Sequence, residues 1–357
     1  MGRLRFGLYV ASSHKSPFEV AEQAQKAEEA GFDSFWFTDH LIDDNIHLEH
    51  GETWTSLTLA ATRTNSIKLG SGVTDPFRRH PSVTAQTVAT LDQISSGRAI
   101  LGMGAGEAMN LEPFGVHFDD PVRRLEESII VIRRLWQGSA QIPVSFRGNI
   151  LSLTNAFLQI TPIQKPSPPI YVGALSRKTR EIAGKYGDGW LPWINSPTSY
   201  QERLKDVEKG AKEAGKSLND IDTVATVDVA VSSDREKARK SALSSSKTAL
   251  VLERSLLREM NYRLTLPASI SIQRGIFTKD TMALLDRAII QVPDRAAEQI
   301  CAFGTADDCI TKLEQYVKAG AKHILISNQG PDERATLDAI ANEVIPYLRS
   351  TYSDISN

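Results

Sequence analysis

Asp39 and His40 are the residues of this chain whose types and position most directly indicate chemistry. They close the segment 32–38, which we predict to be a short, largely buried strand because its apolar residues form a run too short for a helix. In parallel α/β folds, ligands gather at the carboxyl ends of strands, where these two titratable side chains would stand. The alternative, that Asp39 caps the next helix and His40 lies on the surface, stays open from this segment alone.

A second candidate site follows the next predicted strand. The stretch from Ile67 to Pro76 places Gly70, Gly72 and Pro76 where that strand ends. Glycine at such a point permits a bulge or the close approach of a flat ligand. An ordinary turn between a strand and a helix would use the same residue types.

Glu107 lies in the glycine-containing stretch 104–110, directly after the predicted strand 98–103. This stretch does not complete the dinucleotide-binding pattern G-x-G-x-x-G, because Met109 replaces the third glycine, so a nicotinamide site of the Rossmann type is not indicated. Partial burial beside glycine-rich backbone would raise the pKa of Glu107 and let it exchange protons near neutral pH. A solvated glutamate is the alternative.

A candidate anion site lies where the predicted strand 169–173 leads into a helix. Backbone amides of a glycine-containing loop at a helix N-terminus bind anions, and Arg177 and Lys178 add positive charge. The loop therefore suits a phosphate, although a plain turn would look the same.

Metal catalysis is not indicated. His47 and His50 stand at i and i+3, but the H-E-x-x-H motif is absent and no third ligand is apparent, so we predict a solvated surface and no metal site. We expect His80 and His117 to be structural or solvent-facing, and His323 to begin the last strand.

Composition narrows the class of partner. The chain has 357 residues and a net charge of −2, from 41 basic and 43 acidic residues, and no basic run with interleaved aromatics, which argues against a nucleic-acid or anionic-membrane surface. The two cysteines, Cys301 and Cys309, are too few for a disulfide framework and fit a reducing cytosol, and we expect both to be buried helix residues. No apolar run is long enough for a membrane helix, so we expect a cytoplasmic protein that acts on a small molecule.

Strand-like and helix-like segments alternate along most of the chain, a rhythm typical of parallel strands with crossover helices. The predicted strands are 4–10, 32–38, 67–73, 98–103, 169–173, 188–192, 221–231 and 321–327. The predicted helices are 17–30, 53–64, 81–95, 119–137, 176–186, 198–215, 305–319 and 331–349. Because eight strands close a barrel, we predict an α/β fold, a (β/α)8 TIM barrel with insertions.

Two stretches interrupt this rhythm, residues 138–168 and 245–303, and we interpret both as insertions on one barrel domain that spans 1–350, followed by a tail at 351–357. Leu250, Leu252, Leu256 and Leu257 give the second insertion a helical periodicity. We expect it to cover the barrel mouth or to form an oligomer contact.

Taken together, these segments resemble the bacterial luciferase-like superfamily over nearly the whole chain. The runs 72–81, 90–92 and 96–99 resemble methylenetetrahydromethanopterin reductases and related enzymes that use the deazaflavin coenzyme F420. The run 104–110 resembles the corresponding stretch of F420-dependent glucose-6-phosphate dehydrogenases.

The resemblance implies roles for individual residues. Glu107 would be the acid/base group, Asp39 and His40 would lie beside the deazaflavin ring as further catalytic residues, and Gly72–Val73 would form a non-prolyl cis peptide behind the ring. Gly173 to Arg177 would hold the coenzyme phosphate. The implied cofactor-binding residues are Asp39, Gly72, Val73, Thr74, Gly106, Glu107, Asn110, Gly173, Ala174, Leu175, Ser176 and Arg177.

The implied function is an F420-dependent oxidoreductase that transfers hydride. No lysine occurs in 191–196, where a sugar-phosphate enzyme would bind the phosphate of its substrate. Trp193 in the same segment favours a flatter substrate. The leading expectation is therefore a methylene-tetrahydropterin and a place in one-carbon metabolism. An F420-dependent alcohol or sugar dehydrogenase, an FMN-dependent monooxygenase and a non-catalytic relative are the alternatives, and relatives suggest a homodimer.

Overall fold

Eight parallel strands form the centre of the molecule. The computed structural model describes residues 3–11, 16–43, 49–267 and 270–353. The barrel strands are β1 (Arg5–Val10), β2 (Ser34–Phe37), β3 (Lys68–Ser71), β4 (Ala99–Gly104), β7 (Ile170–Gly173), β8 (Gly189–Leu191), β9 (Asp222–Val231) and β11 (His323–Asn328). Each strand pairs with its two neighbours, and β1 pairs with β11 while β8 pairs with β9, so that the ring closes. The predicted (β/α)8 barrel is confirmed.

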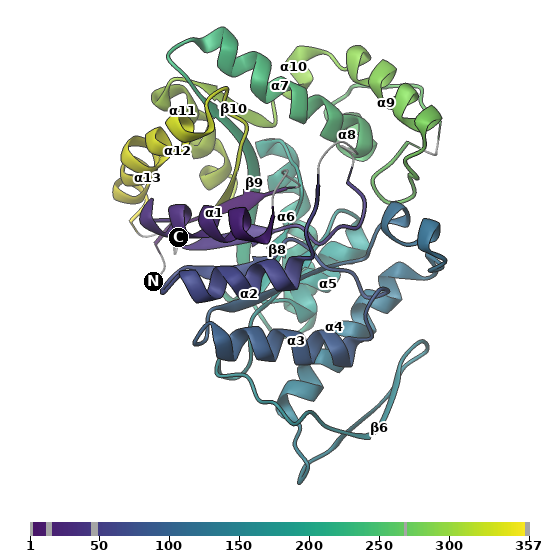
Figure 1. The fold of residues 1–357 in the computed structure, drawn as a ribbon. Helices are drawn as coiled ribbons and strands as arrows, with labels where there is room; N and C mark the ends of the chain where they lie inside the picture. The colour runs from purple at the N-terminus through teal and green to yellow at the C-terminus, as the bar shows by residue number, and fades with distance from the viewer. Residues whose placement is uncertain (1–2, 12–15, 44–48, 268–269, 354–357) are drawn as a thin grey trace.

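Helices cover the outside of the barrel (Figure 1). Those around the barrel are α1 (Pro17–Glu29), α2 (Thr53–Arg63), α3 (Pro81–Ile94), α4 (Pro121–Gln137), α5 (Arg177–Tyr186), α6 (Pro197–Glu213) and α11 (Ala306–Lys318). The predicted helix 331–349 consists of α12 (Glu333–Ala339), a π-helical turn (Ile340–Val344) and α13 (Ile345–Thr351). Short 3-10 turns occupy Ala108–Asn110, Glu112–Phe114 and Leu218–Asp220.

The barrel interior is filled by side chains from alternate strand positions. Successive residues of a strand point to opposite faces, so residues two apart share one face. The interior cluster contains Trp36, Ile100, Tyr171, Leu191, Val224 and Leu325, whereas the opposite faces of the strands pack against the helices. This alternation decides which residues reach the barrel mouth.

A polar network lies inside the amino end of the barrel. His323, which begins β11 as predicted, lies 2.9 Å from Ser34 Oγ through Nε2 and 3.0 Å from Asp222 Oδ2 through Nδ1. Tyr171 donates to the same carboxylate and Arg5 pairs with it. Although the order Ser–His–Asp is that of a hydrolase triad, all three side chains are buried and Trp36 donates to Ser34, so the network closes the barrel floor.

A ninth parallel strand, β10 (Cys301–Gly304), pairs with the outer half of β9. It fits there because β8 is short and pairs with β9 only at Asp222 and Thr223, which leaves the rest of that edge open. Cys301 therefore lies on a strand, and its predicted place on a helix is wrong. Cys309 is a buried residue of α11, as predicted.

The two predicted interruptions of the barrel rhythm carry structure of their own. In the first, β5 (Val144–Arg147) and β6 (Ser152–Ala156) form an antiparallel hairpin that projects at the bottom of Figure 1. The second contains α7 (Arg235–Leu252), α8 (Arg254–Glu259), α9 (Lys279–Gln291) and α10 (Asp294–Ala297), drawn in green at the top. We call residues 235–267 and 270–297 the cover. Its helices begin before residue 245, because Asp234 caps α7 through the Lys237 amide.

None of the helices in the described parts of the chain has the length and apolar character needed to cross a membrane.

Candidate active site

A cavity of about 850 Å³ lies at the carboxyl ends of the barrel strands, under the cover. Residues at or just beyond the ends of β1, β2, β3, β4, β7, β8 and β11, and residues within β9, contribute to its wall. The sequence-predicted residues that line it are Asp39, His40, Gly72, Val73, Thr74, Gly106, Glu107, Asn110, Gly173, Ala174 and Leu175. The fold thus brings together residues from segments that are far apart in the sequence.

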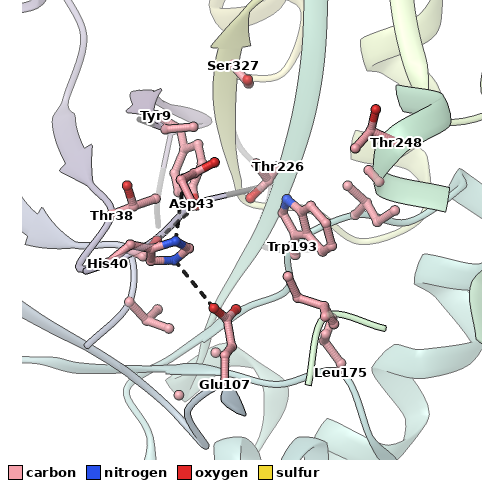
Figure 2. Close-up of a pocket in the computed structure, with 18 of the residues that line it drawn as sticks. Tyr9, Thr38, His40, Asp43, Glu107, Leu175, Trp193, Thr226, Thr248 and Ser327 are labelled. Atoms are coloured by element: carbon pink, nitrogen blue, oxygen red, sulfur yellow. Dashed lines mark hydrogen bonds and ion pairs between the residues drawn. The ribbon is translucent and has the colours of Figure 1, made fainter. Parts of the chain in front are cut away.

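His40 lies between two carboxylates in this cavity (Figure 2). Its Nε2 is 3.7 Å from Glu107 Oε2, and its Nδ1 is 3.4 Å from Asp43 Oδ2. The side chains of His40 and Glu107 keep only 17% and 24% of their surface exposed. The imidazole therefore has a carboxyl group on each side and is largely buried.

This environment shifts both pKa values. Burial alone would lower the pKa of His40, but the carboxylates of Glu107, Asp43 and Asp39 raise it to about 9. Burial raises the pKa of Glu107, while the nearby imidazole opposes that shift. His40 is consequently an imidazolium at neutral pH, and Glu107 is a carboxyl group whose proton affinity is increased. A proton-exchanging pair of this kind marks a candidate catalytic site.

Asn110 fixes the position of His40 relative to Glu107. Its side-chain oxygen accepts hydrogen bonds from the backbone amides of Leu41 and Ile42 at 2.6 and 2.8 Å, and its side-chain nitrogen donates to Glu107 Oε2 at 3.1 Å. The buried amide thereby connects the loop that carries His40 to the 3-10 turn that follows Glu107.

Asp39 lines the cavity, but its carboxylate already has several protein partners. Oδ2 accepts from the Thr74 hydroxyl at 2.6 Å and lies 3.1 Å from both the Arg78 and the Arg79 guanidinium groups. Arg78 also pairs with Asp75. The alternative that Asp39 caps the next helix does not apply, since Glu52 caps α2 through the Thr55 amide. Asp39 instead connects the ends of β2 and β3.

Three glycines form one wall of the cavity. The peptide bond between Gly72 and Val73 is cis, as the resemblance implies, and Tyr9 donates to Gly72 O at 2.9 Å. The Val73 side chain occupies space that β-carbons would otherwise take, because a Cβ would lie 2.7 Å from it at Gly104 and 3.0 Å at Gly173. This arrangement produces a smooth, narrow wall around the Val73 side chain.

Ser176 and Arg177 are the predicted site residues that the structure does not bring to the cavity. The Ser176 hydroxyl accepts from the Thr179 amide as the N-cap of α5. Arg177 is 68% exposed and pairs with Glu181 at 3.2 Å on the outer surface of the helix. The cavity is lined here by Gly173, Ala174, Leu175 and Thr179.

Several residues of the cavity were not predicted from the sequence. They are Tyr9, Thr38, Asp43, Thr226, Asp228, Ser241, Ser244, Ser245, Thr248, Asp286, Ser327 and Gln329. Period-two alternation in β9 and β11 could have identified some of them, since Thr226 and Asp228 follow the interior residue Val224, and Ser327 follows the interior residue Leu325.

His50 is not the solvated surface residue that the sequence suggested. Its ring stacks on Phe37 with centroids 4.9 Å apart, and its Nε2 lies 2.9 Å from Thr38 O. The segment 49–54 folds back against the end of β2, which half-buries the ring. His47 lies outside the described residues. His80 caps α3 and His117 is exposed, in agreement with the sequence-based expectation.

The charged side chains of the cavity wall share one sign, apart from His40. The acidic ones are Asp39, Asp43, Asp75, Glu107, Asp228 and Asp286. Within residues 3–11, 16–43, 49–267 and 270–353, no lysine or arginine lines the cavity, and no group of His, Cys, Asp or Glu is arranged to hold a metal ion.

The cover closes over this cavity, in agreement with one of its two expected roles. Serine, threonine and alanine residues of α7 and apolar residues of α9 line the cavity. The Ala108 amide, next to Glu107, donates to Gln273 O at 2.9 Å, so the cover also contacts the turn that follows Glu107 directly.

The sequence is similar to those of F420-dependent enzymes over nearly its whole length. The chain is 32% identical over 353 residues to a 5,10-methylenetetrahydromethanopterin reductase of Archaeoglobus fulgidus, covering 97% of this chain and 100% of that protein. It is 30% identical over 360 residues to an F420-dependent glucose-6-phosphate dehydrogenase of Microbacterium testaceum, covering 98% and 99% of the two chains.

Solved structures give the same result. The coenzyme F420-dependent tetrahydromethanopterin reductase of Methanopyrus kandleri superposes with a TM-score of 0.82 at 27% identity, over 97% of this chain and 100% of that one. An F420-dependent secondary alcohol dehydrogenase, solved with an F420–acetone adduct, superposes with a TM-score of 0.83 at 26% identity, over 97% and 99% of the two chains. The family model described as luciferase-like monooxygenase matches residues 4–323, and the chain belongs to this family.

Proposed function

We propose that the protein is a coenzyme F420-dependent oxidoreductase whose substrate is a methylene-tetrahydropterin. The observation that carries this proposal is the His40–Glu107 pair beside a glycine wall in one cavity. The full-length similarity to a methylenetetrahydromethanopterin reductase supports it. A role in one-carbon metabolism is part of the proposal, and a homodimer in the cytoplasm stays a prediction from the sequence.

The residues of the cavity fit a flat tricyclic coenzyme. Because Gly104 and Gly173 have no β-carbon, the Val73 side chain has room between them, where a β-carbon at either position would collide with Val73. The Val73 side chain would contact one face of the coenzyme ring. The buried Thr38 hydroxyl has no hydrogen-bond partner within the described residues, so it is available to a ligand. Backbone amides at Ala174 and Leu175 would face the coenzyme phosphate. When bound, F420 donates or accepts the hydride.

The side chains of the protein would hold or transfer protons near the site of that hydride transfer. His40 carries a proton at neutral pH and presents Nε2 toward Glu107. Glu107 can take up or release a proton at Oε2, because burial raises its pKa toward the working range of a general acid or base. Residues of the cover line the cavity and reduce the exposure of this pair to water, which strengthens these electrostatic interactions.

The charge of the cavity supports a substrate without a phosphate group at the reacting end. Six acidic side chains line the wall, and the absence of lysine and arginine among its described residues disfavours a sugar phosphate. A reduced pterin presents neutral N–H groups and suits such a wall better. A secondary alcohol is the second candidate, favoured by the match to the alcohol dehydrogenase structure.

The test is a titration of the purified protein with oxidised F420 and, separately, with FMN, followed by ring fluorescence. We expect F420 to bind at least tenfold more tightly than FMN, and reduced F420 to be consumed when methylene-tetrahydromethanopterin is added. Preference for FMN would contradict the proposal and would redirect the search to oxygen-dependent reactions. Binding of F420 with turnover of secondary alcohols alone would replace the pterin with the second candidate.

A further inference from the structure

The strand β9 carries a polar stripe into the cavity that the proposed chemistry does not use. Val224 belongs to the barrel interior, and Thr226 and Asp228 follow it on the same face, toward the carboxyl end. Both side chains line the cavity. The Thr226 hydroxyl donates to Pro192 O at 3.0 Å, whereas Asp228 lies further out, under the cover.

The cavity therefore has two chemically different walls. Glycines and Val73 form the wall beside β3, β4 and β7. Thr226, Asp228, Ser327 and hydroxyl groups of α7 form the wall beside β9 and β11. In Figure 2, Ser327 and Thr248 lie away from His40 and Glu107, with Trp193 and Thr226 between the two groups. A flat coenzyme fits the smooth wall, which leaves the polar wall to the substrate.

Asp228 is the acceptor at the centre of the polar wall. Ser246 on α7 donates to its Oδ2 at 3.0 Å, and Ser245 and Ser327 also hydrogen-bond to the carboxylate. A carboxylate can accept about four hydrogen bonds, so these three donors leave it with acceptor capacity. Burial raises the pKa of Asp228, and the three hydroxyl groups oppose that shift.

An alternative role for Asp228 is to anchor α7 to the barrel. A purely structural anchor would be sealed from the cavity, as Asp222 is at the other end of the same strand. Asp228 instead is partly exposed and belongs to the cavity wall. An Asp228 that only anchors α7 would not contact a ligand, whereas an Asp228 that accepts hydrogen bonds in the cavity would. An experiment on ligand binding can therefore distinguish the two roles.

We propose that Asp228, flanked by the hydroxyl groups of Ser245 and Ser327, is the specificity-determining residue that accepts hydrogen bonds from the substrate. The matching group is an uncharged edge with adjacent N–H donors, such as the 2-amino and ring N–H groups of a pterin. This inference rests on the proposed function, since it names how that substrate is held. The acidic wall agrees with it, because such a wall disfavours anions and suits donors.

The test uses the variant Asp228→Asn in the full-length, F420-loaded enzyme. Asparagine keeps the shape of the side chain and one acceptor oxygen. Its amide nitrogen, however, is a hydrogen-bond donor and would face the N–H donors of the substrate. We expect the KM for methylene-tetrahydromethanopterin to rise at least tenfold, while the F420 dissociation constant stays within twofold and kcat within about threefold.

The matched control is Ser246→Ala, which weakens the anchor of α7 but keeps the carboxylate. We expect its KM to change by less than threefold. Equal increases in KM for Ser246→Ala and Asp228→Asn would identify Asp228 as an anchor and would overturn the inference. An unchanged KM in Asp228→Asn would also overturn it.

A second measurement separates this inference from the proposed function. Quenching of protein fluorescence by tetrahydromethanopterin, with Trp193 in the cavity wall as one emitter, needs neither coenzyme nor turnover. At least tenfold weaker pterin binding in Asp228→Asn supports the inference even if the enzyme proves to prefer FMN. Equal pterin affinity in both proteins overturns it even if F420 binds as proposed.

Discussion

His40 keeps its proton because carboxylates face both of its ring nitrogens. Burial works against the charged form, yet Glu107 and Asp43 outweigh it and bring the pKa of His40 to about 9. Because the pKa is above the unfolded value of about 6.5, the stability that this proton contributes is complete below about pH 6.5 and is lost as the pH rises through about 9. Activity that depends on the imidazolium should follow the same upper limit.

The prediction at this scale concerns the alkaline limb of the rate–pH profile. In the wild type we expect kcat/KM to fall with an apparent pKa near 9. Asp43→Asn removes one of the charges that raise the pKa of His40, so the limb should move to lower pH by about one unit. Glu49→Gln, on an exposed side chain of the same loop, is the control and should leave the limb in place. A limb that stays near 9 in Asp43→Asn would exclude His40 as its origin.

At the scale of single elements, Arg98 joins three segments beside the start of β4. Its five N–H groups donate to Ser95 O, to Ala61 O and Thr64 O at the end of α2, to Thr64 Oγ1, and to Ile67 O before β3. The distances range from 2.6 to 3.0 Å, and the side chain is buried. These bonds satisfy carbonyl groups that the end of a helix leaves without partners.

We predict that Arg98→Lys destabilises the fold, because an ammonium group has three N–H donors and cannot replace the five N–H donors of the planar guanidinium group. Acceptors left unpaired in the interior should lower the free energy of unfolding by about 2–4 kcal/mol, measured by urea denaturation. The control is Arg123→Lys, whose half-exposed pair with Asp120 should change stability by less than about 0.5 kcal/mol. Equal stability of Arg98→Lys and the wild type would mean that water replaces the lost donors.

At the scale of the whole molecule, the cover is fastened to the barrel by Arg203. Its guanidinium, which is 3% exposed, lies 3.0 Å from Glu259 on α8 and donates to Asn195 after β8 at 3.0 Å. It also lies near the buried Glu253, at 3.5 Å. One residue of α6 thus links the barrel with the segment that closes its mouth.

Replacing Arg203 with methionine should loosen the cover, since it leaves Glu253 without this partner in a buried position. We expect amide hydrogen exchange in 249–267 to accelerate at least tenfold, while exchange in β1 to β4 stays unchanged. Lys205→Met, which removes only an exposed pair with Glu202, is the control. Uniform acceleration throughout the barrel would show instead that Arg203 stabilises the whole fold.

The barrel and much of one cavity wall were predictable from the sequence. Hydrophobic runs and helix signals are local, so all eight barrel strands and their order could be read directly. Glycines 72, 104 and 173 at strand ends, and His40 and Glu107 beyond them, follow from the rule that parallel strands place their carboxyl ends together. The sequence by itself therefore determined the scaffold and the candidates for its mouth.

Only the tertiary structure decided which candidates meet and what surrounds them. Arg177 turns to the surface because the helix start at Ser176 orients it away from the cavity, and Asp39 is engaged by arginines from the next loop. Asp228 meets Ser246 only when the cover folds over the barrel. Such contacts join segments distant in the chain, and local periodicity carries no information about distances between them. The pKa of His40 depends on the same long-range approach of Glu107.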